Sequence, residues 1–500
     1  MGKGGVRLVK RAVATAKWAL FLFFANLQLS ADSLHLKSSY TDGGRLSEGA
    51  YEIVTAIRAD TSILCPKERY ALGDIDYLLQ NIFLKDDALS KLNERLSRSF
   101  SLYRKDREKG CIDPYHVYPD KISIDYEHLK GIDGENILLR RLEKILFKYE
   151  KIVENGGWKR VDNSFGILKK GDFSKAVGSI KERLYISGDY NQSDFDNYLF
   201  TDSLKKSVAL FQKRHSIKSD GIVGPQTVTA MNISADDIVK KIKINIERLR
   251  WLTGGTKEFI AVNIPSFTLE LYKDEKPQLS MKCIVGRKDR PTPMVSDLLT
   301  YAVLNPYWRV PKSIVKKDIL PKLKDGKIDY LKKIGISASK KVDTSETVDL
   351  ASIDWSRYSG NDIPFIFMQK PGPMNYLGLV KFMFPNPLDI YIHDTPKNGL
   401  FKYRNRLFSS GCIRAEKPIE LFHAILKIGG RSEWSYKRIF EVLMTRKEKL
   451  VGLPKPIPVY ILYMTAYADE NLKLFLYPDI YGYDKVMQEY IASSQRFQDR

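Results

Sequence analysis

The spacing of hydrophobic residues changes once along the chain, near residue 258. Before that point, apolar residues recur every three or four positions, as in residues 73–100, 136–158 and 235–252. This spacing places the apolar side chains on one face of a helix, so we predict amphipathic helices in these segments. Residues 201–232 follow the same pattern, with Thr201 or Asp202 as a helix cap and a further short helix beginning near Pro225.

After residue 258 the period falls to two. Residues 258–273, 276–286 and 299–308 alternate apolar and polar positions, which predicts β-strands. In the second of these segments Cys283 falls on the apolar side, so we expect it to be buried. Residues 457–484 are expected to form a hairpin that closes the same sheet. Between the strands, the lysine-rich residues 311–367 predict a helical insertion.

The change of period predicts a multidomain α+β fold. A helical N-terminal scaffold and a small three-helix domain precede a mostly β domain with a helical insertion. The expected boundaries are 1–31 for a signal peptide or membrane anchor, 32–169 for the scaffold, 170–235 for the three-helix domain, 236–257 for a connecting helix, 258–485 for the β domain with its insertion at about 312–365, and 486–500 for a C-terminal tail.

The first 31 residues resemble an export signal. Lysines and arginines come first, an apolar run from Trp18 to Leu29 follows, and the small residue Ala31 comes next. The run is short for a permanent span, which needs about 20 apolar residues. We therefore expect export to the periplasm or cell envelope. An uncleaved anchor in the inner membrane remains the alternative, and it would be the chain's one link to a membrane.

Composition and charge narrow the class of partner. The 500 residues are 43% hydrophobic and 28% charged, which is typical of folded domains. A net charge of +21 can indicate a protein that binds nucleic acid. Here, however, the basic residues are spread along the chain and form no dominant block. We find no zinc-ligand spacing and no RNA-binding motif, so the sequence predicts no metal, no cofactor and no nucleic-acid partner.

The chain has four cysteines, and in an oxidising compartment Cys65 and Cys111 could form a disulfide, although the sequence leaves this open. Cys412 stands apart. It follows two serines and Gly411, precedes Arg414 by two residues, and comes nineteen residues after His393. A thiol becomes a strong nucleophile when a neighbouring imidazole removes its proton or forms an ion pair with it. Gly411 would allow a tight turn whose backbone N–H groups stabilise an oxyanion.

Two other features of this segment bear on the same chemistry. His393 lies on a predicted strand with Tyr391 on the same face, and the loop 394–408 can bring Cys412 back beside it. Arg414 has the planar, charged fork that binds carboxylates. The alternative for Arg414 is a salt bridge to Glu416 or Glu420.

These motifs resemble two known families. Residues 170–232 are similar to the small peptidoglycan-binding domain, through Phe211, Gln212, Asp220, Gly221, Gly224 and Thr227. The later region resembles the L,D-transpeptidase family (the YkuD-type catalytic domain, a β-sandwich), and within it the larger, YcbB-like branch. The resemblance rests on His393, on the Ser-Ser-Gly-Cys-Ile-Arg motif, and on residues 286–296, 304–314, 369–386 and 478–484. Smaller members of the family carry His and Asn where this chain has Ser410 and Arg414.

The resemblance implies a reaction. Cys412 would attack the third residue of a tetrapeptide stem, release the terminal D-alanine, and pass the acyl group to an amine, giving a 3→3 cross-link. His393 would transfer protons, and Arg414, Ser409, Ser410, Tyr391, Asn375 and Tyr376 would bind the substrate. The insertion would form a lid over the site, and a carbapenem would acylate Cys412.

Several alternatives stay open at this point. The acyl group could pass to water, as in an L,D-carboxypeptidase, or to an amine of an outer-membrane or wall-anchored protein. A non-catalytic wall-binding protein is a further possibility, although it would not need His393, Gly411 and Cys412 together. Cysteine amidases and endopeptidases usually place the nucleophile before the histidine, the reverse of the order found here.

Overall fold

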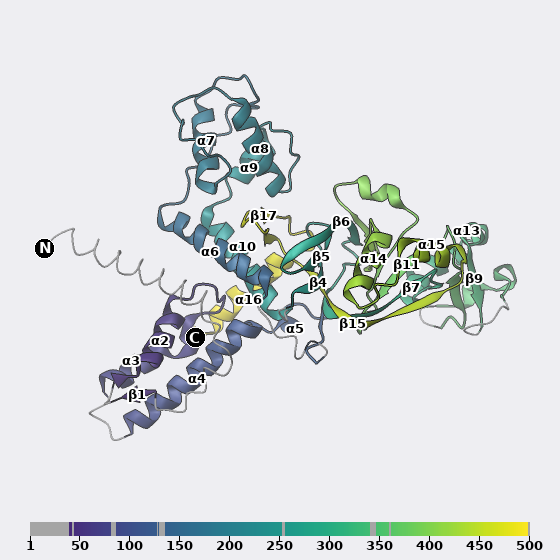
Figure 1. The fold of residues 1–500 in the computed structure, drawn as a ribbon, viewed down its shortest axis with the longest axis horizontal. Helices are drawn as coiled ribbons and strands as arrows, with labels where there is room; N and C mark the ends of the chain where they lie inside the picture. The colour runs from purple at the N-terminus through teal and green to yellow at the C-terminus, as the bar shows by residue number, and fades with distance from the viewer. Residues whose placement is uncertain are drawn as a thin grey trace. The chain divides into compact units, whose positions relative to one another are not determined.

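The computed structural model describes residues 40–42, 45–81, 87–127, 129, 136–252, 256–340, 347–359 and 362–498. The expected signal or anchor at residues 1–31 lies outside this part of the chain. Within the described residues, no helix combines the length and the hydrophobicity needed to cross a bilayer. The chain divides into two compact units, residues 1–113 and 114–500, and Figure 1 shows their elements.

The first unit is mainly helical. Its elements are β1 (Thr41–Asp42), β2 (Arg45–Leu46), α2 (Glu48–Ala59), η1 (Lys67–Tyr70), α3 (Leu72–Gln80) and α4 (Ala88–Lys109). Apolar faces of these helices form one hydrophobic core that includes Ile57, Leu92 and Leu96, all fully buried. Cys65 and Cys111, whose pairing the sequence left open, form a disulfide with their Cα atoms 6.1 Å apart. This bond ties the segment after α2 to the end of α4.

The first unit ends at Asp113, so three elements that the sequence analysis grouped with the N-terminal region lie in the second unit. They are α5 (Pro114–Val117), β3 (Ile122–Ile124) and α6 (Ile137–Glu154). β3 pairs in parallel with a strand of the large sheet. α6 packs on the connecting helix α10 (Ala235–Trp251), which was predicted at residues 235–252, and the Lys243–Glu150 ion pair of 3.2 Å links the two helices.

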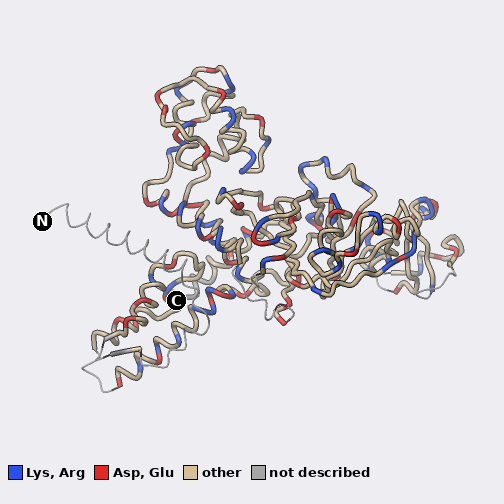
Figure 2. The backbone as a smooth tube through the Cα atoms, viewed as in Figure 1, with Lys and Arg blue, Asp and Glu red and all other residues tan. Residues whose placement is uncertain are grey.

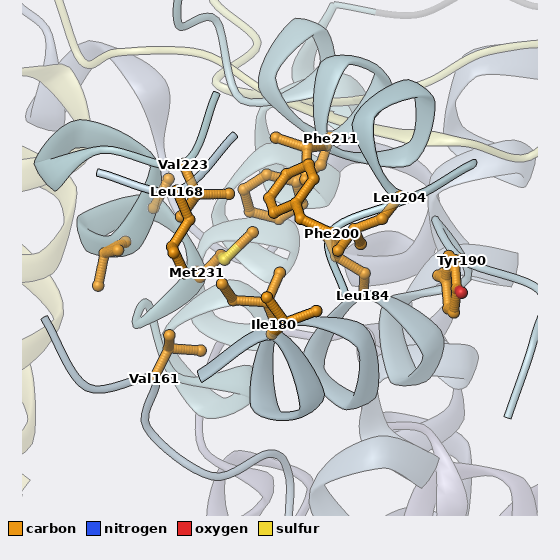
Figure 3. Packing of buried hydrophobic residues seen from close by; sticks show 14 residues of the cluster. Val161, Leu168, Ile180, Leu184, Tyr190, Phe200, Leu204, Phe211, Val223 and Met231 are labelled. Atoms are coloured by element: carbon orange, nitrogen blue, oxygen red, sulfur yellow. The ribbon is translucent and has the colours of Figure 1, made fainter. Parts of the chain in front are cut away.

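The predicted three-helix domain is confirmed as α7 (Ala176–Ser187), α8 (Asp202–Arg214) and α9 (Pro225–Met231). Figure 3 shows how its buried side chains converge from all three helices and from the loops between them. The predicted cap is also present, because the Thr201 hydroxyl accepts a hydrogen bond from the Leu204 N–H. The buried Gln212 side chain bonds the backbone of Gly221 and Ile222, so this part of the motif holds the turn before α9.

The β domain is built on one large sheet whose described strands close on themselves. The order is β11-β12-β14-β6-β5-β4-β15-β7-β3, and β7 also pairs with β11. The strands are β4 (Glu258–Asn263), β5 (Thr268–Lys273), β6 (Lys276–Gly286), β7 (Met294–Leu304), β11 (Val380–Met383), β12 (Ile392–His393), β14 (Ile413–Ala415) and β15 (Lys449–Leu462), and β13 (Leu407–Ser409) pairs with β6 beside this path. Cys283 on β6 is fully buried, as its alternation predicts.

One expectation for the C-terminus is wrong. The predicted hairpin at 457–484 was to close the large sheet, but only β15 joins it, between β4 and β7. The strands that follow, β16 (Ala466–Ala468) and β17 (Leu474–Leu476), pair with each other in a separate sheet. The chain then ends in helix α16 (Tyr483–Gln498), where a tail was expected from residue 486.

The predicted helical insertion is present and adds a small sheet of its own. It contains α11 (Lys312–Ile314), the π-helical turn η2 (Val315–Ile319), α12 (Leu320–Lys324), α13 (Ile328–Lys333), β9 (Ile336–Ser339), η3 (Leu350–Ser352) and η4 (Trp355–Arg357). β8 (Trp308–Arg309) and β9 flank β10 (Ile366–Gln369) in a three-stranded sheet. Two further helices, α14 (Pro418–Ile428) and α15 (Tyr436–Met444), follow β14. Figure 2 shows basic and acidic residues interspersed along the backbone, in line with the scattered charge of the sequence.

Candidate active site

The segments that carry His393 and Cys412 are neighbours in the large sheet. β12 and β14 run parallel, with Ile392 opposite Ile413 and His393 opposite Arg414. The Ile413 N–H donates to the Tyr391 carbonyl at 3.1 Å, which sets Cys412 beside Tyr391. Since side chains alternate across a sheet, Tyr391, His393, Cys412 and Arg414 share one face. The sequence predicted this meeting from the strand and the returning loop.

A third strand adds a residue that the sequence analysis missed. β11 is antiparallel to β12 and places Lys381 opposite His393. Lys381, His393 and Arg414 therefore form a row across three adjacent strands, on the face that also carries Cys412. The imidazole thus lies between two basic side chains. Lys381 lies within residues 369–386, which carried the family resemblance, but only the register of the strands gives it a place in the site.

The electrostatics of this row keep the imidazole neutral. His393 is 5% exposed, and burial together with the positive charges of Arg414 and Lys381 lowers its pKa to about 3. Its Nδ1–H donates to the Asp394 carbonyl at 2.5 Å, because a carbonyl oxygen can only accept. Nε2 is therefore the basic atom of the ring, and the Asp394 backbone is the group that orients it.

Cys412 is half-buried at the edge of the hydrophobic cluster formed by the insertion. Burial raises the pKa of its thiol above the ordinary value, although hydrogen bonds from Tyr391 and the charges of Lys381 and Arg414 act in the opposite direction. The Sγ atom lies 3.8 Å from the Asp389 carbonyl oxygen. The resting pair is thus a protonated thiol and a neutral imidazole. Of the two possibilities raised by the sequence, this resting environment argues against a preformed thiolate–imidazolium ion pair.

Hydrogen bonds from two residues distant in the sequence, Thr292 and Tyr481, stabilise the turn before Cys412. Gly411 has φ of 124°, a conformation that residues with a side chain rarely adopt. Its carbonyl accepts a hydrogen bond of 2.6 Å from the hydroxyl of Thr292, which is fully buried. That hydroxyl also accepts from the Gly286 N–H at 2.8 Å, and the Tyr481 hydroxyl donates to the Gly286 carbonyl at 2.6 Å. Thr292 and Tyr481 lie in segments that carried the resemblance, but no motif along the chain indicates this role for them.

The backbone N–H groups of this turn differ in what they bond. The Gly411 N–H donates to Ser409 Oγ at 3.2 Å, so it is already engaged. For the Cys412 N–H, the described residues offer no acceptor within hydrogen-bonding distance. Cys412 itself therefore has the N–H best suited to receive an oxyanion.

Arg414 does not form the salt bridge considered as its alternative. Glu416 is bound instead to Lys282, whose Nζ lies 3.3 Å from the carboxylate. The Arg414 Nε is buried and has no hydrogen-bond partner in the described chain. Burial also lowers the pKa of this guanidinium. A buried cation without a carboxylate is costly, and its presence beside the nucleophile points to an anionic ligand.

The other predicted substrate-binding residues lie at different depths. Tyr391 and Tyr376 lie close to the row, with the Tyr391 ring 5.6 Å from the His393 ring and Tyr376 packed 5.1 Å from Trp308. Ser409 is buried and Ser410 is exposed, where it accepts a hydrogen bond from Arg290 at 3.2 Å. Asn375 is 1% exposed. Its side-chain amide donates a hydrogen bond to the carbonyl of Pro306, just before β8, and accepts one from the N–H of Leu377 in its own loop. Its contacts are those of a loop anchor, and its binding role stays a prediction.

A groove opens between the sheet and the insertion, and two of its lining residues, Asp389 and Tyr391, adjoin the Cys412 segment. Its volume is about 510 Å³, and its walls include Arg309, Val315, Lys381, Asn386, Asp389 and Tyr391. The insertion is fastened at this place by Arg290, which makes a two-pronged ion pair with Asp318 of η2 and also reaches Ser410. The described residues contain no group of three side chains suited to hold a metal ion.

Comparison with known proteins identifies the two domains. Residues 257–451 match the family described as "L,D-transpeptidase catalytic domain". The part of the chain that holds His393 and Cys412 is therefore similar to an L,D-transpeptidase catalytic domain. Residues 174–231 match the family described as "Putative peptidoglycan binding domain", so both resemblances noted in the sequence are confirmed. The mostly β fold of the catalytic domain, with helical regions before it, is confirmed as well.

Two individual proteins are similar to parts of the chain. A "Putative L,D-transpeptidase" of Haemophilus influenzae is 37% identical over 249 residues, which cover 50% of this chain and 49% of that relative. The chain thus matches about half the length of this curated protein. A solved structure of a fused Zn-dependent amidase/peptidase/peptidoglycan-binding-domain protein from Clostridium acetobutylicum covers 59% of this chain and 98% of its own, at 14% identity and a TM-score of 0.16. That score is too low to support an argument about the fold.

Proposed function

We propose that the chain is a cysteine-dependent L,D-transpeptidase that acts on the tetrapeptide stems of peptidoglycan. The matches to the catalytic and wall-binding families support this class of reaction and this class of substrate. The observation that carries the proposal for the nucleophile is the parallel pairing of β12 and β14, which sets Cys412 and His393 on one face of one sheet.

The first half of the reaction forms a thioester. The neutral His393 accepts the thiol proton at Nε2 while the Cys412 sulfur attacks the carbonyl carbon of the third stem residue. A C–S bond forms, and the carbonyl electrons move to oxygen. When the tetrahedral intermediate collapses, the C–N bond breaks and the D-alanine amine takes the proton back from the imidazolium.

The developing oxyanion needs donors that are not already engaged. The Cys412 N–H is the candidate, and such a donor contributes about 3 kcal/mol in acyl transfer. Arg414 would hold a carboxylate of the donor stem, because its guanidinium lies beside the nucleophile without an acidic partner. Binding of an anion there would offset the cost of burying this charge.

The second half transfers the acyl group. We assign it to the side-chain amine of a second stem, which gives a 3→3 cross-link. The same thioester would yield an L,D-carboxypeptidase with water and a tethered protein with a protein amine. The wall-binding domain and the Cys65–Cys111 disulfide support a location in the cell envelope, because disulfides persist in oxidising compartments.

Mass spectrometry of disaccharide-tetrapeptide incubated with the purified chain tests the proposal. We expect loss of D-alanine with new dimers for the wild type, and neither product for Cys412→Ala or His393→Ala. The matched control is Cys283→Ala, which removes the other free thiol and should keep the activity. Loss of D-alanine without dimers would replace cross-linking by hydrolysis or a protein acceptor. Equal activity in Cys412→Ala would refute the assigned nucleophile.

A further inference from the structure

Lys381 occupies a position in the active site that the proposed mechanism leaves unexplained. It lies opposite His393 on β11, on the far side of the imidazole from Arg414. Neighbouring strands are about 4.8 Å apart, so Lys381 and Arg414 lie about 10 Å apart across the sheet, with His393 midway. Lys381 also lines the groove of about 510 Å³, together with Asp389 and Tyr391, which adjoin the Cys412 segment.

The ammonium group of Lys381 has no acidic partner at close range. Its recorded contact is with the Tyr391 ring, whose centroid is 3.9 Å from Nζ, and no carboxylate of the described residues lies within ion-pair distance. Cys412, Glu448 and Asp389 raise the pKa of this ammonium only through longer-range charge interactions, while Arg309 has the same sign of charge and lowers it. Burial lowers the pKa of Lys381, which records the cost of holding a charge in this groove. An anion in the groove would remove that cost.

The reaction brings an anion to this place. The D-alanine amine must reach His393 to take up its proton, and the D-alanine carboxylate is two bonds beyond that amine. The row offers two cations for carboxylates next to the imidazole. In the proposed function Arg414, two residues from Cys412 on the same segment, holds the donor stem that stays on the sulfur. The departing residue would then extend toward Lys381, on the other side of His393.

We propose that Lys381 binds the C-terminal carboxylate of the leaving D-alanine and thereby selects stems that end at the fourth residue. This inference rests on the proposed function and deepens it. A stem with a fifth residue has a neutral amide where the fourth carboxylate would be, so it loses this ion pair. Lys381 is then a specificity residue, and the Tyr391 ring keeps its ammonium aimed into the groove.

Donors that differ only at the chain end test the proposal. D-alanine or D-alaninamide release is measured for disaccharide-tetrapeptide with a free carboxylate and for the same donor with a C-terminal carboxamide. A hydrogen-bonded charge pair predicts that the wild type prefers the free acid by about 10- to 100-fold in kcat/KM. Lys381→Met should abolish this preference, and Lys381→Arg should keep much of it. The ratio of the two donors is independent of the fraction of folded enzyme.

The matched control is Lys402→Met. Lys402 is an exposed lysine that lies over a tyrosine ring, Tyr403, at 5.5 Å, and it is outside the groove, so the preference should not change. If Lys381→Met slows both donors equally, or if the wild type does not distinguish them, the proposal is wrong. The first result would mean that Lys381 only tunes the thiol or supports the fold.

Binding to Cys412→Ala separates this inference from the proposed function. Calorimetry with the acid and the amide donor measures recognition without turnover, with and without the Lys381→Met change. If the acid is preferred and the preference needs Lys381, the assignment holds even when the wild type fails to release D-alanine. That failure would refute the proposed reaction alone. Equal affinities for both donors would refute the role of Lys381.

Discussion

A single methyl group at Gly411 tests the geometry of the nucleophile turn. A Cβ at this position would meet Ile390 Cδ1 at 3.4 Å and the Pro291 carbonyl oxygen at 3.9 Å, which are ordinary contacts. Space is therefore not the obstacle to Gly411→Ala. The cost comes from φ of 124°, and backbone strain of this kind is worth about 1–3 kcal/mol.

The strain can be relieved only by moving the nucleophile. Rotating φ toward negative values would turn the Gly411 carbonyl away from the Thr292 hydroxyl, a bond of 2.6 Å, and would shift the N–H and Cα of Cys412. A displacement of about 1 Å in a reacting group costs about 100-fold in rate. We therefore expect Gly411→Ala to lower D-alanine release by about two orders of magnitude, and to lower the unfolding midpoint by a few degrees.

Gly399→Ala is the matched control. Gly399 has no positive φ, and a Cβ there would meet no atom within 4 Å, so the change should be neutral. D-alanine release and the alkylation rate of Cys412 are measured on both variants, together with thermal unfolding. A Gly411→Ala enzyme that turns over at the wild-type rate would show that the turn does not depend on this backbone conformation, and the argument would fail.

Three further predictions concern the thiol, the turn and the first unit. The rate at which iodoacetamide alkylates Cys412 should rise about tenfold per pH unit from about pH 6 to 8, because burial raises the thiol pKa and the imidazole is neutral. A rate that stays constant at low pH would instead reveal a thiolate–imidazolium pair. Thr292→Val removes the hydrogen-bond partner of two buried backbone groups, the Gly286 N–H and the Gly411 carbonyl, and each loss should lower the free energy of unfolding in urea by about 1–3 kcal/mol. The control Thr229→Val, at an exposed threonine, should change it by no more than about 0.5 kcal/mol. Equal urea midpoints for the two variants would contradict the role of the Thr292 hydroxyl. Reduction of the Cys65–Cys111 disulfide, which spans 46 positions, should lower the free energy of unfolding of the first unit by about 4 kcal/mol. Proteolysis within residues 40–113 should then become faster, and an unchanged cleavage rate would show that the unit does not need the bond.

The sequence predicted the parts of the site that depend on residue order. His393 on a strand, followed by a loop and a glycine turn, predicts that the Cys412 segment returns to that strand, and β12 and β14 are indeed paired in parallel. The three helices of the wall-binding domain and the burial of Cys283 followed from apolar spacing alone. These features are local, or they follow from the alternation of a single strand.

The features that were missed depend on which strands become neighbours. Lys381 lies in an alternating segment like many others, and only pairing of β11 with β12 sets it beside the imidazole. Thr292 and Tyr481 are 119 and 70 residues from Gly411, so no pattern along the chain connects them with the turn. The C-terminal strands alternate as the large sheet requires, yet β16 and β17 find each other instead. Pairing partners are set by tertiary packing, which single-strand patterns do not contain.

The parallel register of β12 and β14 has a consequence for how this protein can change. Backbone hydrogen bonds set the spacing of the two segments that carry His393 and Cys412, and a slip of one residue would turn Cys412 to the other face of the sheet. The loop of residues 396–405 and the insertion before β10 take no part in this strand pairing. Both can lengthen, shorten or exchange residues while the reactive pair stays in place. Recognition of new acceptors can therefore evolve at the rim of the groove without rebuilding the chemistry.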